Sequence, residues 1–392
     1  MVARRTGRPI YLDNHATTPV DPRVLDAMLP YFKERFGNPH SASHFYGWEA
    51  AEAVEIAREQ VARLIGADAD EIVFTSGATE SNNLALKGVA RFYRERKNHV
   101  VTCVTEHMCV LDSAFQLEKE GTRVTYVRVK ADGLIDLDEL RQAITDDTAI
   151  VSIMAVQNEI GVIQPVVEIG AMCRAKGAFF HTDAAQAAAK VPLDVKAMQI
   201  DLLSLTAHKI YGPMGIGALY VTKRPRVRLQ PLFSGGGQEK NLRSGTLPAP
   251  LVVGFGAACE IGQSEMTDEA VRLGVLRGRL LERLNAAGGV HVNGSMAARV
   301  PGNLNVSVDG CRAEDIMAAV PDLAFSSGSA CTSVSEESSY VLRALGLSNE
   351  MADSSLRFGL GRFTTDDEID YAADRLVEEI ANQRVRTRHA AE

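Results

Sequence analysis

The feature that most constrains the fold is a pattern that repeats between residues 70 and 222, in which a short apolar run precedes a polar or glycine-rich turn and an amphipathic stretch. Runs that are apolar throughout, rather than alternating, are typical of strands covered by helices on both faces. The pattern therefore predicts an α/β unit with a mainly parallel, seven-stranded sheet. The seven runs are EIVF (71–74), HVVTCV (99–104), VTYVRV (124–129), AIVSIMAV (149–156), AFFH (178–181), DLLSL (201–205) and GALYV (217–221).

The stretches between and after these runs predict helices. We expect a helix over 163–176, with Pro165 in its first turn, where proline is tolerated. After Pro248 a long helical pattern continues to about residue 287. Further helices are expected near 138–144, 313–320 and 338–345.

The chain changes character beyond the long helix. Two short strand-like pieces, NLNVSV (303–308) and SLRFGL (355–360), lie among expected helices and indicate a smaller α+β unit. The N-terminal segment is expected to complete this unit. We therefore predict a large domain over residues 16–255 and a small domain formed by residues 1–15 and 256–392.

Charge and apolar content disfavour several classes of protein. A net charge of −8 and a pI near 5.7 disfavour nucleic-acid binding, which needs clustered Lys and Arg. No segment has the run of about eighteen apolar residues that spans a membrane, and the start of the chain does not have the apolar core of a signal peptide. We expect a cytoplasmic protein with no nucleic-acid or membrane partner.

The six cysteines, at positions 103, 109, 173, 259, 311 and 331, are too scattered for a disulfide framework, and none forms a C-x-x-C pair. Reduced thiols are therefore expected. His107 lies between Cys103 and Cys109, but the usual spacings of zinc ligands are missing. We expect no metal site.

Two motifs follow predicted strands. VFTSGATESNNLAL (73–86) is typical of a strand, a tight turn and a helix whose N-terminus, at Ala78 and Thr79, could bind a phosphate. A plain β–α turn with a capping threonine is the alternative. HTDAAQ (181–186) places Asp183 at a strand end, where its carboxylate could accept a pyridinium N–H, or where it could equally cap a helix.

A lysine completes this set. SLTAHKIYGPMGIGALYV (204–221) places Lys209 just after another strand, where apolar neighbours could keep its amine neutral and able to form a Schiff base. Most lysines are simply solvated surface charges. A phosphate-type turn, an acid and a lysine, each at a strand end of one sheet, together indicate a pyridoxal-phosphate site.

The order of SGATE, EH, QNEIG, HTDAAQ, AHKIYGP, RSGT and SSGSACTS resembles that of the cysteine desulfurases of the iron–sulfur cluster assembly type, which are fold-type I pyridoxal-phosphate enzymes of the class V aminotransferase group. The resemblance runs from YLDNHATTP (11–19) to LRFGLGRFTT (356–365). It implies that Lys209 binds the cofactor covalently and later moves the Cα proton. It also implies that Asp183 pairs with the ring nitrogen, Gln186 bonds the ring hydroxyl and His107 stacks on the ring. The phosphate would be bound by Ala78, Thr79, Thr206 and His208, and by Thr246 of a second subunit, which implies a homodimer.

The resemblance also assigns the substrate side. Asn158 and Arg357 would bind the carboxylate of L-cysteine, which the planar fork of an arginine suits. Cys331 lies in AFSSGSACTSVSEESSY (324–340), a run of small polar residues without apolar periodicity, which predicts an exposed, mobile loop. Its thiolate would take the sulfur as a persulfide, leave alanine as product, and pass the sulfur to an acceptor such as an iron–sulfur scaffold protein.

Two alternatives remain open at this stage. A different pyridoxal-phosphate reaction, such as transamination or selenocysteine cleavage, would need Lys209 and Asp183 but not Cys331. A non-catalytic partner protein is the second alternative, against which the intact motif residues argue. Three features depart from the family pattern: Met108 where lysine is common, Ser338 where proline is common, and a short C-terminus, which leaves the sulfur acceptor open.

Overall fold

The computed structural model describes residues 7–327 and 338–391 of the 392-residue chain, with side chains described to residue 386. Its larger unit is built on a seven-stranded sheet in the order β2-β8-β7-β6-β5-β3-β4. β8 is antiparallel to both of its neighbours, and the other pairings are parallel. Each of the seven predicted runs forms a strand: β2 Ile72–Thr75, β3 His99–Cys103, β4 Arg123–Val127, β5 Thr148–Ser152, β6 Phe179–Asp183, β7 Leu202–Thr206 and β8 Gly217–Val221.

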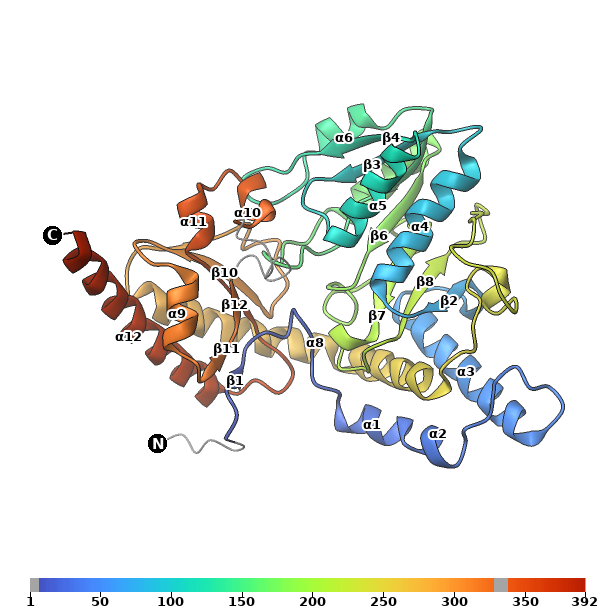
Figure 1. Ribbon diagram of the computed structural model, residues 1–392, viewed down its shortest axis with the longest axis horizontal. Coiled ribbons are helices and arrows are strands. Elements are labelled where there is room, and N and C mark those ends of the chain that lie inside the picture. The colour runs from blue at the N-terminus through green and yellow to red at the C-terminus, as the bar shows by residue number, and fades with distance from the viewer. Residues whose placement is uncertain (1–6, 328–337, 392) are drawn as a thin grey trace.

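Helices cover both faces of this sheet (Figure 1). Neighbouring residues of β2 show this directly, because Val73 belongs to one apolar core and Phe74 to the core on the other face. Burial on both faces explains why the strand runs are apolar throughout. The helices of this unit are α1 Pro22–Met28, α2 Pro30–Lys33, α3 Phe45–Leu64, α4 Ala78–Tyr93, α5 Met108–Lys119, α6 Leu137–Ala143 and α7 Val166–Lys176, with 3₁₀ turns at Ala69–Glu71, Ala207–Lys209 and Glu239–Asn241.

The predicted start of one helix was wrong. Helix α7 begins at Val166 rather than at residue 163. Ile163 forms a β-bridge with Val156, and Gln164 precedes a proline, which disfavours helical backbone at that residue. Pro165 therefore stands at the N-cap of the helix and not within its first turn.

A smaller unit follows, with an antiparallel four-stranded sheet in the order β12-β13-β10-β9. The N-terminal strand β1 pairs in parallel with β11, so the first described residues join this unit. Its elements are β1 Ile10–Tyr11, β9 Val290–Val292, β10 Asn303–Val308, β11 Leu323–Ala324, β12 Ser326–Ser327, β13 Ser355–Gly359, α9 Ala313–Ala319, α10 Tyr340–Ala344, α11 Asn349–Asp353 and α12 Asp366–Ala391.

Helix α8, Ala249–Asn285, joins the two units and extends from one to the other across Figure 1. Its first half packs into the core of the large unit through Val252 and Phe255, and its second half packs into the core of the small unit through Leu276 and Leu280. A domain division at residues 255 and 256 therefore falls within a continuous helix. No described helix is both long and apolar enough to cross a membrane.

Candidate active site

A cleft of about 550 Å³ lies at the ends of β2, β6 and β7 and is closed on one side by the small unit. Ligands of parallel α/β sheets bind at this edge, because the carboxyl ends of several strands meet there. Ten of the predicted site residues line the cleft: Ala78, Thr79, His107, Asn158, Asp183, Gln186, Thr206, His208, Lys209 and Arg357.

The turn between β2 and α4 forms the end of the cleft that suits an anion. Gly77 stands at the N-cap of α4 with φ of 153°, a backbone conformation that favours glycine. Gly217 crosses behind it, and a Cβ on Gly217 would lie 2.6 Å from the Gly77 Cα. The two glycines allow this close approach, so that the first N–H groups of the sixteen-residue helix α4 face the cleft beside Ala78 and Thr79.

Asp183 ends strand β6 and is buried in the floor of the cleft. Its Oδ2 accepts a hydrogen bond from Asn82 Nδ2 at 2.7 Å, and its Oδ1 accepts one from the Ala185 N–H at 2.9 Å. The alternative prediction was that Asp183 caps a helix. Its Oδ1 does accept the N–H of Ala185, as a cap would, but turns and no helix follow Asp183. Asn82 was not predicted, although it lies three residues after Thr79 and hence on the same face of α4.

Lys209 lies in the 3₁₀ turn that follows β7, and its amine reaches the N-terminal segment. Its Nζ donates to the carbonyl oxygens of His15, at 2.5 Å, and Ala16, at 2.6 Å. Gln186 Nε2 donates to the same His15 carbonyl at 2.8 Å. Burial lowers the pKa of the neighbouring His208 to about 4, so this imidazole is neutral near pH 7.

His107 is the N-cap of α5, and this role fixes its tautomer. Its Nδ1 accepts the backbone N–H of Cys109 at 3.2 Å, so the proton of the neutral ring is on Nε2. Burial holds the pKa of His107 below its usual value, with Asp183 raising it and Lys209 lowering it. His107 therefore presents a neutral imidazole to the cleft. The Cys109 thiol also lines the cleft, and burial raises its pKa to about 12, which disfavours the thiolate.

Arg357 reaches the cleft from strand β13 of the small unit and is 2% exposed. Its Nη2 donates to Asp13 Oδ1 at 2.8 Å and to Ser326 Oγ at 3.3 Å, and its Nη1 donates to the Asn158 carbonyl oxygen at 3.2 Å. Its Nε has no partner among the described residues. A held guanidinium with unused donor capacity suits a carboxylate ligand.

The two other predicted site residues have different outcomes. Thr246 is exposed and does not line the cleft of its own chain. Cys331 lies outside the described residues. Of the departures from the family pattern, Met108 is the first residue of α5, and Ser338 Oγ donates to Asp353 Oδ1 at 2.6 Å.

The residues in the cleft fit pyridoxal phosphate. A lysine amine, a buried carboxylate, a neutral imidazole and the N-terminus of α4 line one cavity large enough for such a ligand. The close packing of Gly217 against the Gly77 backbone holds the turn before α4 at the cleft, where Gly77 has no side chain to fill it. Lys209 would hold the cofactor, Asp183 would bond its ring nitrogen, and Ala78 and Thr79 would bind its phosphate.

Comparison with known proteins agrees with this chemistry. The family model described as Aminotransferase class-V matches residues 10–372. Cysteine desulfurase IscS of Rickettsia felis is 58% identical over 373 residues, which are 95% of this chain and 91% of that protein. Among solved structures, a NifS-like protein has a TM-score of 0.89 and 36% identity, with 95% of this chain and 99% of that chain covered. The structure described as SspA in complex with cysteine has a TM-score of 0.81 and 39% identity, with 91% and 99% covered.

Proposed function

Since the chain belongs to the aminotransferase class-V family and is a pyridoxal-phosphate-dependent cysteine desulfurase, we propose that Lys209 carries the cofactor and that Cys331 receives the sulfur of L-cysteine. The observation that carries the cofactor assignment is the convergence of Lys209, Asp183 and the N-terminus of α4 in one cleft. A solved relative is described as a complex with cysteine, which supports the same substrate here.

The groups in the cleft divide the work of the reaction. When bound, the cofactor supplies a pyridinium ring that draws electron density from the substrate Cα and so weakens the bond from Cβ to sulfur. Asp183, held by Asn82, keeps the ring nitrogen protonated. Lys209 Nζ takes and returns the Cα proton. Arg357 and Asn158 would orient the substrate carboxylate, and His107, which lines the cleft as a neutral imidazole, would stack on the ring.

The assignment of Cys331 is supported by the contacts of the residues on either side of the undescribed segment. Before it, Ser326 Oγ donates to Asp13 Oδ2 at 2.8 Å and accepts a bond from Arg357. After it, Ser339 Oγ donates to Glu159 Oε2 at 2.6 Å, next to Asn158. The described chain thus leaves and returns at the groups proposed to bind the substrate carboxylate.

Cys331 has a simple role in bond making. Its thiolate attacks the substrate sulfur, so an S–S bond forms while the bond from Cβ to sulfur breaks. The electron pair of the broken bond stays with carbon, which takes up a proton, and alanine leaves. The enzyme keeps the sulfur as a persulfide that a thiol acceptor can take.

We further propose a homodimer in which Thr246 completes the phosphate site of the partner. Thr246 is exposed and does not line the cleft of its own chain, which agrees with a role in another subunit. Exposed aromatic side chains at Phe36, Phe45, Tyr46 and Trp48, each 50% or more accessible, offer an apolar surface for such an interface.

The sulfur acceptor is proposed from the relatives. The family resemblance and the IscS relatives favour an iron–sulfur scaffold protein as acceptor. A reducing compartment such as the cytoplasm suits a persulfide carrier, and the five described cysteines are all free thiols.

The decisive experiment gives the purified protein pyridoxal phosphate, L-cysteine and a reductant, and measures alanine and sulfide. We expect both products from the wild type and neither from Lys209→Ala or Cys331→Ala. Without reductant, peptide mapping after one turnover is expected to find the persulfide on Cys331 and not on Cys109, the second thiol at the cleft. Absence of both products in the wild type contradicts the assignment, and alanine formation by Cys331→Ala favours another pyridoxal-phosphate reaction.

A further inference from the structure

Lys190 lies next to the cofactor cleft, and the reaction outlined above does not use it. It follows Ala189, which has φ of 53°, a left-handed conformation that alanine rarely adopts. Gly262 of α8 makes room for this residue, since a Cβ on Gly262 would lie 2.5 Å from the Ala189 Cβ. This backbone turns the Lys190 side chain back, so that its Nζ donates to Gln186 Oε1 at 2.9 Å.

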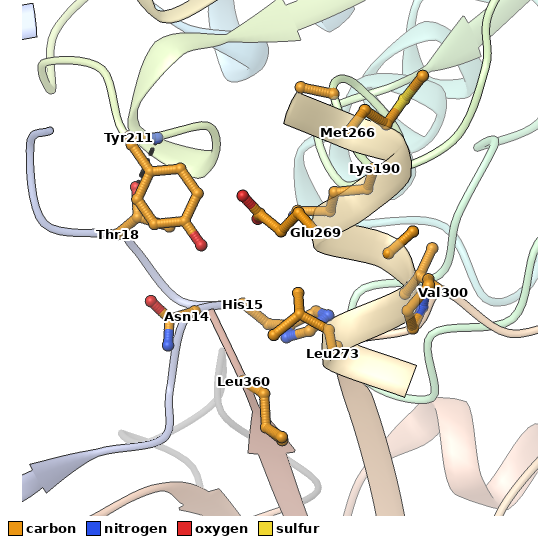
Figure 2. A pocket seen from close by; sticks show the side chains of 14 residues that line it. Asn14, His15, Thr18, Lys190, Tyr211, Met266, Glu269, Leu273, Val300 and Leu360 are labelled. Atoms are coloured by element: carbon orange, nitrogen blue, oxygen red, sulfur yellow. Dashed lines mark hydrogen bonds between the residues drawn. The ribbon is translucent and has the colours of Figure 1, made fainter. Parts of the chain in front are cut away.

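Lys190 also lines a small cavity between α8 and the N-terminal segment (Figure 2). The cavity has a volume of about 30 Å³, enough for one water molecule. His15, which lines both this cavity and the cofactor cleft, separates the two. Glu269 lines the same cavity, but its carboxylate is bonded to Arg362 at 2.9 Å. Among the described residues, Gln186 is the hydrogen-bond partner of Lys190 Nζ.

The two partners of Gln186 determine the orientation of its amide. The His15 carbonyl oxygen only accepts, so Nε2 of Gln186 faces it, and Oε1 then faces Lys190, whose protonated form has only donors and so favours the same orientation. The amide nitrogen has a second N–H, which remains for the cleft. Gln186 therefore offers the cleft a donor rather than an acceptor.

We propose that Lys190 is a positioning residue that fixes the amide of Gln186, so that Gln186 donates a hydrogen bond to the oxygen on the ring of the bound cofactor. This inference rests on the proposed cofactor site. The positive charge behind Gln186 also polarises its amide and strengthens that donation. A stronger hydrogen bond to the ring oxygen would stabilise its anionic form and so lower the pH at which the absorbance of the cofactor-loaded protein changes.

Charged neighbours set the state of Lys190. Burial, helped by the charge of Lys209 and opposed by that of Glu269, lowers the pKa of Lys190 to about 7. His15 faces the same cavity, and burial together with the nearby cations holds its pKa well below the usual value. An anionic ring oxygen beyond Gln186 favours the protonated form of Lys190.

The readout is the pH midpoint at which the visible absorbance band of the cofactor-loaded protein changes. Lys190→Met is expected to raise this midpoint by about one unit, the effect of one charge acting across one side chain at intermediate dielectric constant. It is also expected to raise the dissociation constant of pyridoxal phosphate about tenfold, as one hydrogen bond to a charged group is lost. Lys190→Arg, which keeps a charged donor, is expected to restore both values.

Two controls separate positioning from general damage. Lys196→Met removes an exposed lysine that lies six residues after Lys190 and pairs with Asp68. This variant is expected to leave the midpoint unchanged. In a Gln186→Leu background, Lys190→Met is expected to add less than about a third of its own shift, since its orienting effect acts through Gln186.

The outcomes distinguish this inference from the proposed function. A wild type with no visible band after loading contradicts the cofactor site itself. A wild type with a normal band, together with a Lys190→Met midpoint equal to that of Lys196→Met, overturns the role of Lys190. Full additivity with Gln186→Leu, in variants whose thermal unfolding remains cooperative, overturns it as well.

Discussion

A buried ion pair at the open edge of the large sheet gives the prediction that can be worked out furthest. β2 is an edge strand, and its free side is closed by Arg58 of α3 and by Glu239. Both carboxylate oxygens accept from Arg58 at 2.8 Å, and Oε2 also accepts the Phe74 N–H at 2.6 Å. Arg58 donates in addition to the Ile72 carbonyl oxygen at 2.9 Å. The pair therefore satisfies two backbone groups that the sheet leaves open.

The cost of breaking this pair follows from its burial. The Arg58 and Glu239 side chains are 8% and 3% exposed, and the second acid that Arg58 contacts, Glu55, is 62% exposed. Removing Glu239 therefore leaves a poorly compensated charge in the interior, at a cost of about 3–5 kcal/mol. Glu239→Gln is the most conservative change in shape. It still breaks the pair, because the amide NH₂ must face a donor whichever way it is turned. For a chain of 392 residues, unfolding entropy is about 0.8 kcal/mol/K, so the expected loss lowers Tm by about 4–6 °C.

The assay is calorimetric unfolding of the cofactor-free protein at fixed pH. The matched control is Arg91→Met, which breaks a pair with Glu120 of similar geometry, with bonds of 2.7 and 2.9 Å, but with side chains 31% and 26% exposed. That loss is expected to stay below about 1 kcal/mol. The Arg58→Met/Glu239→Leu double variant is expected to lose less than the sum of Arg58→Met and Glu239→Leu. Additive losses, or a Glu239→Gln variant as stable as the control, refute the reasoning.

Three further predictions address the site and the core. Gly217→Ala is expected to weaken pyridoxal-phosphate binding and to lower the free energy of unfolding by about 1–3 kcal/mol, because the new Cβ intrudes on Gly77. Fluorescence titration of the cofactor and the Tm measure the two effects, and wild-type values for both contradict the prediction. Asn82→Ala removes a donor to Asp183 and is expected to lower kcat about 10- to 100-fold in the alanine assay, whereas an unchanged kcat denies it a positioning role. Burial lowers the pKa of His181 to about 3, so the unfolded state binds its proton first and stability is lost as pH falls below about 6.5. By pH 4.5 the loss is about 2.7 kcal/mol, and His181→Gln should flatten this slope in urea unfolding; an equally steep slope argues against it.

The sheet and the location of the site could be predicted because both follow from patterns local in sequence. An apolar run identifies a strand buried on both faces, and a parallel sheet brings the strand ends to one edge. This rule placed Asp183 and the turn at Ala78 at one edge of the sheet and suggested their roles, and the family resemblance then chose those roles over a helix cap and a plain turn. Cys331 and Thr246 stay predictions, since the first lies outside the described residues and the second lines no part of its own cleft.

Sequence reasoning missed three groups, each for a different physical reason. Asn82 lies one helical turn beyond the phosphate turn, so helical spacing could have found it. Lys190 could not be found in this way, because its direction depends on a left-handed alanine that local preference disfavours. Glu239 pairs with a residue 181 positions earlier, and periodicity reports that a position is buried but never which distant partner meets it. The strand ends thus fix where the chemistry occurs, while the state and orientation of each group there depend on long-range contacts such as Asn82 to Asp183 and Lys190 to Gln186. Those contacts are where substitutions distant from the cofactor are expected to alter its spectrum and affinity.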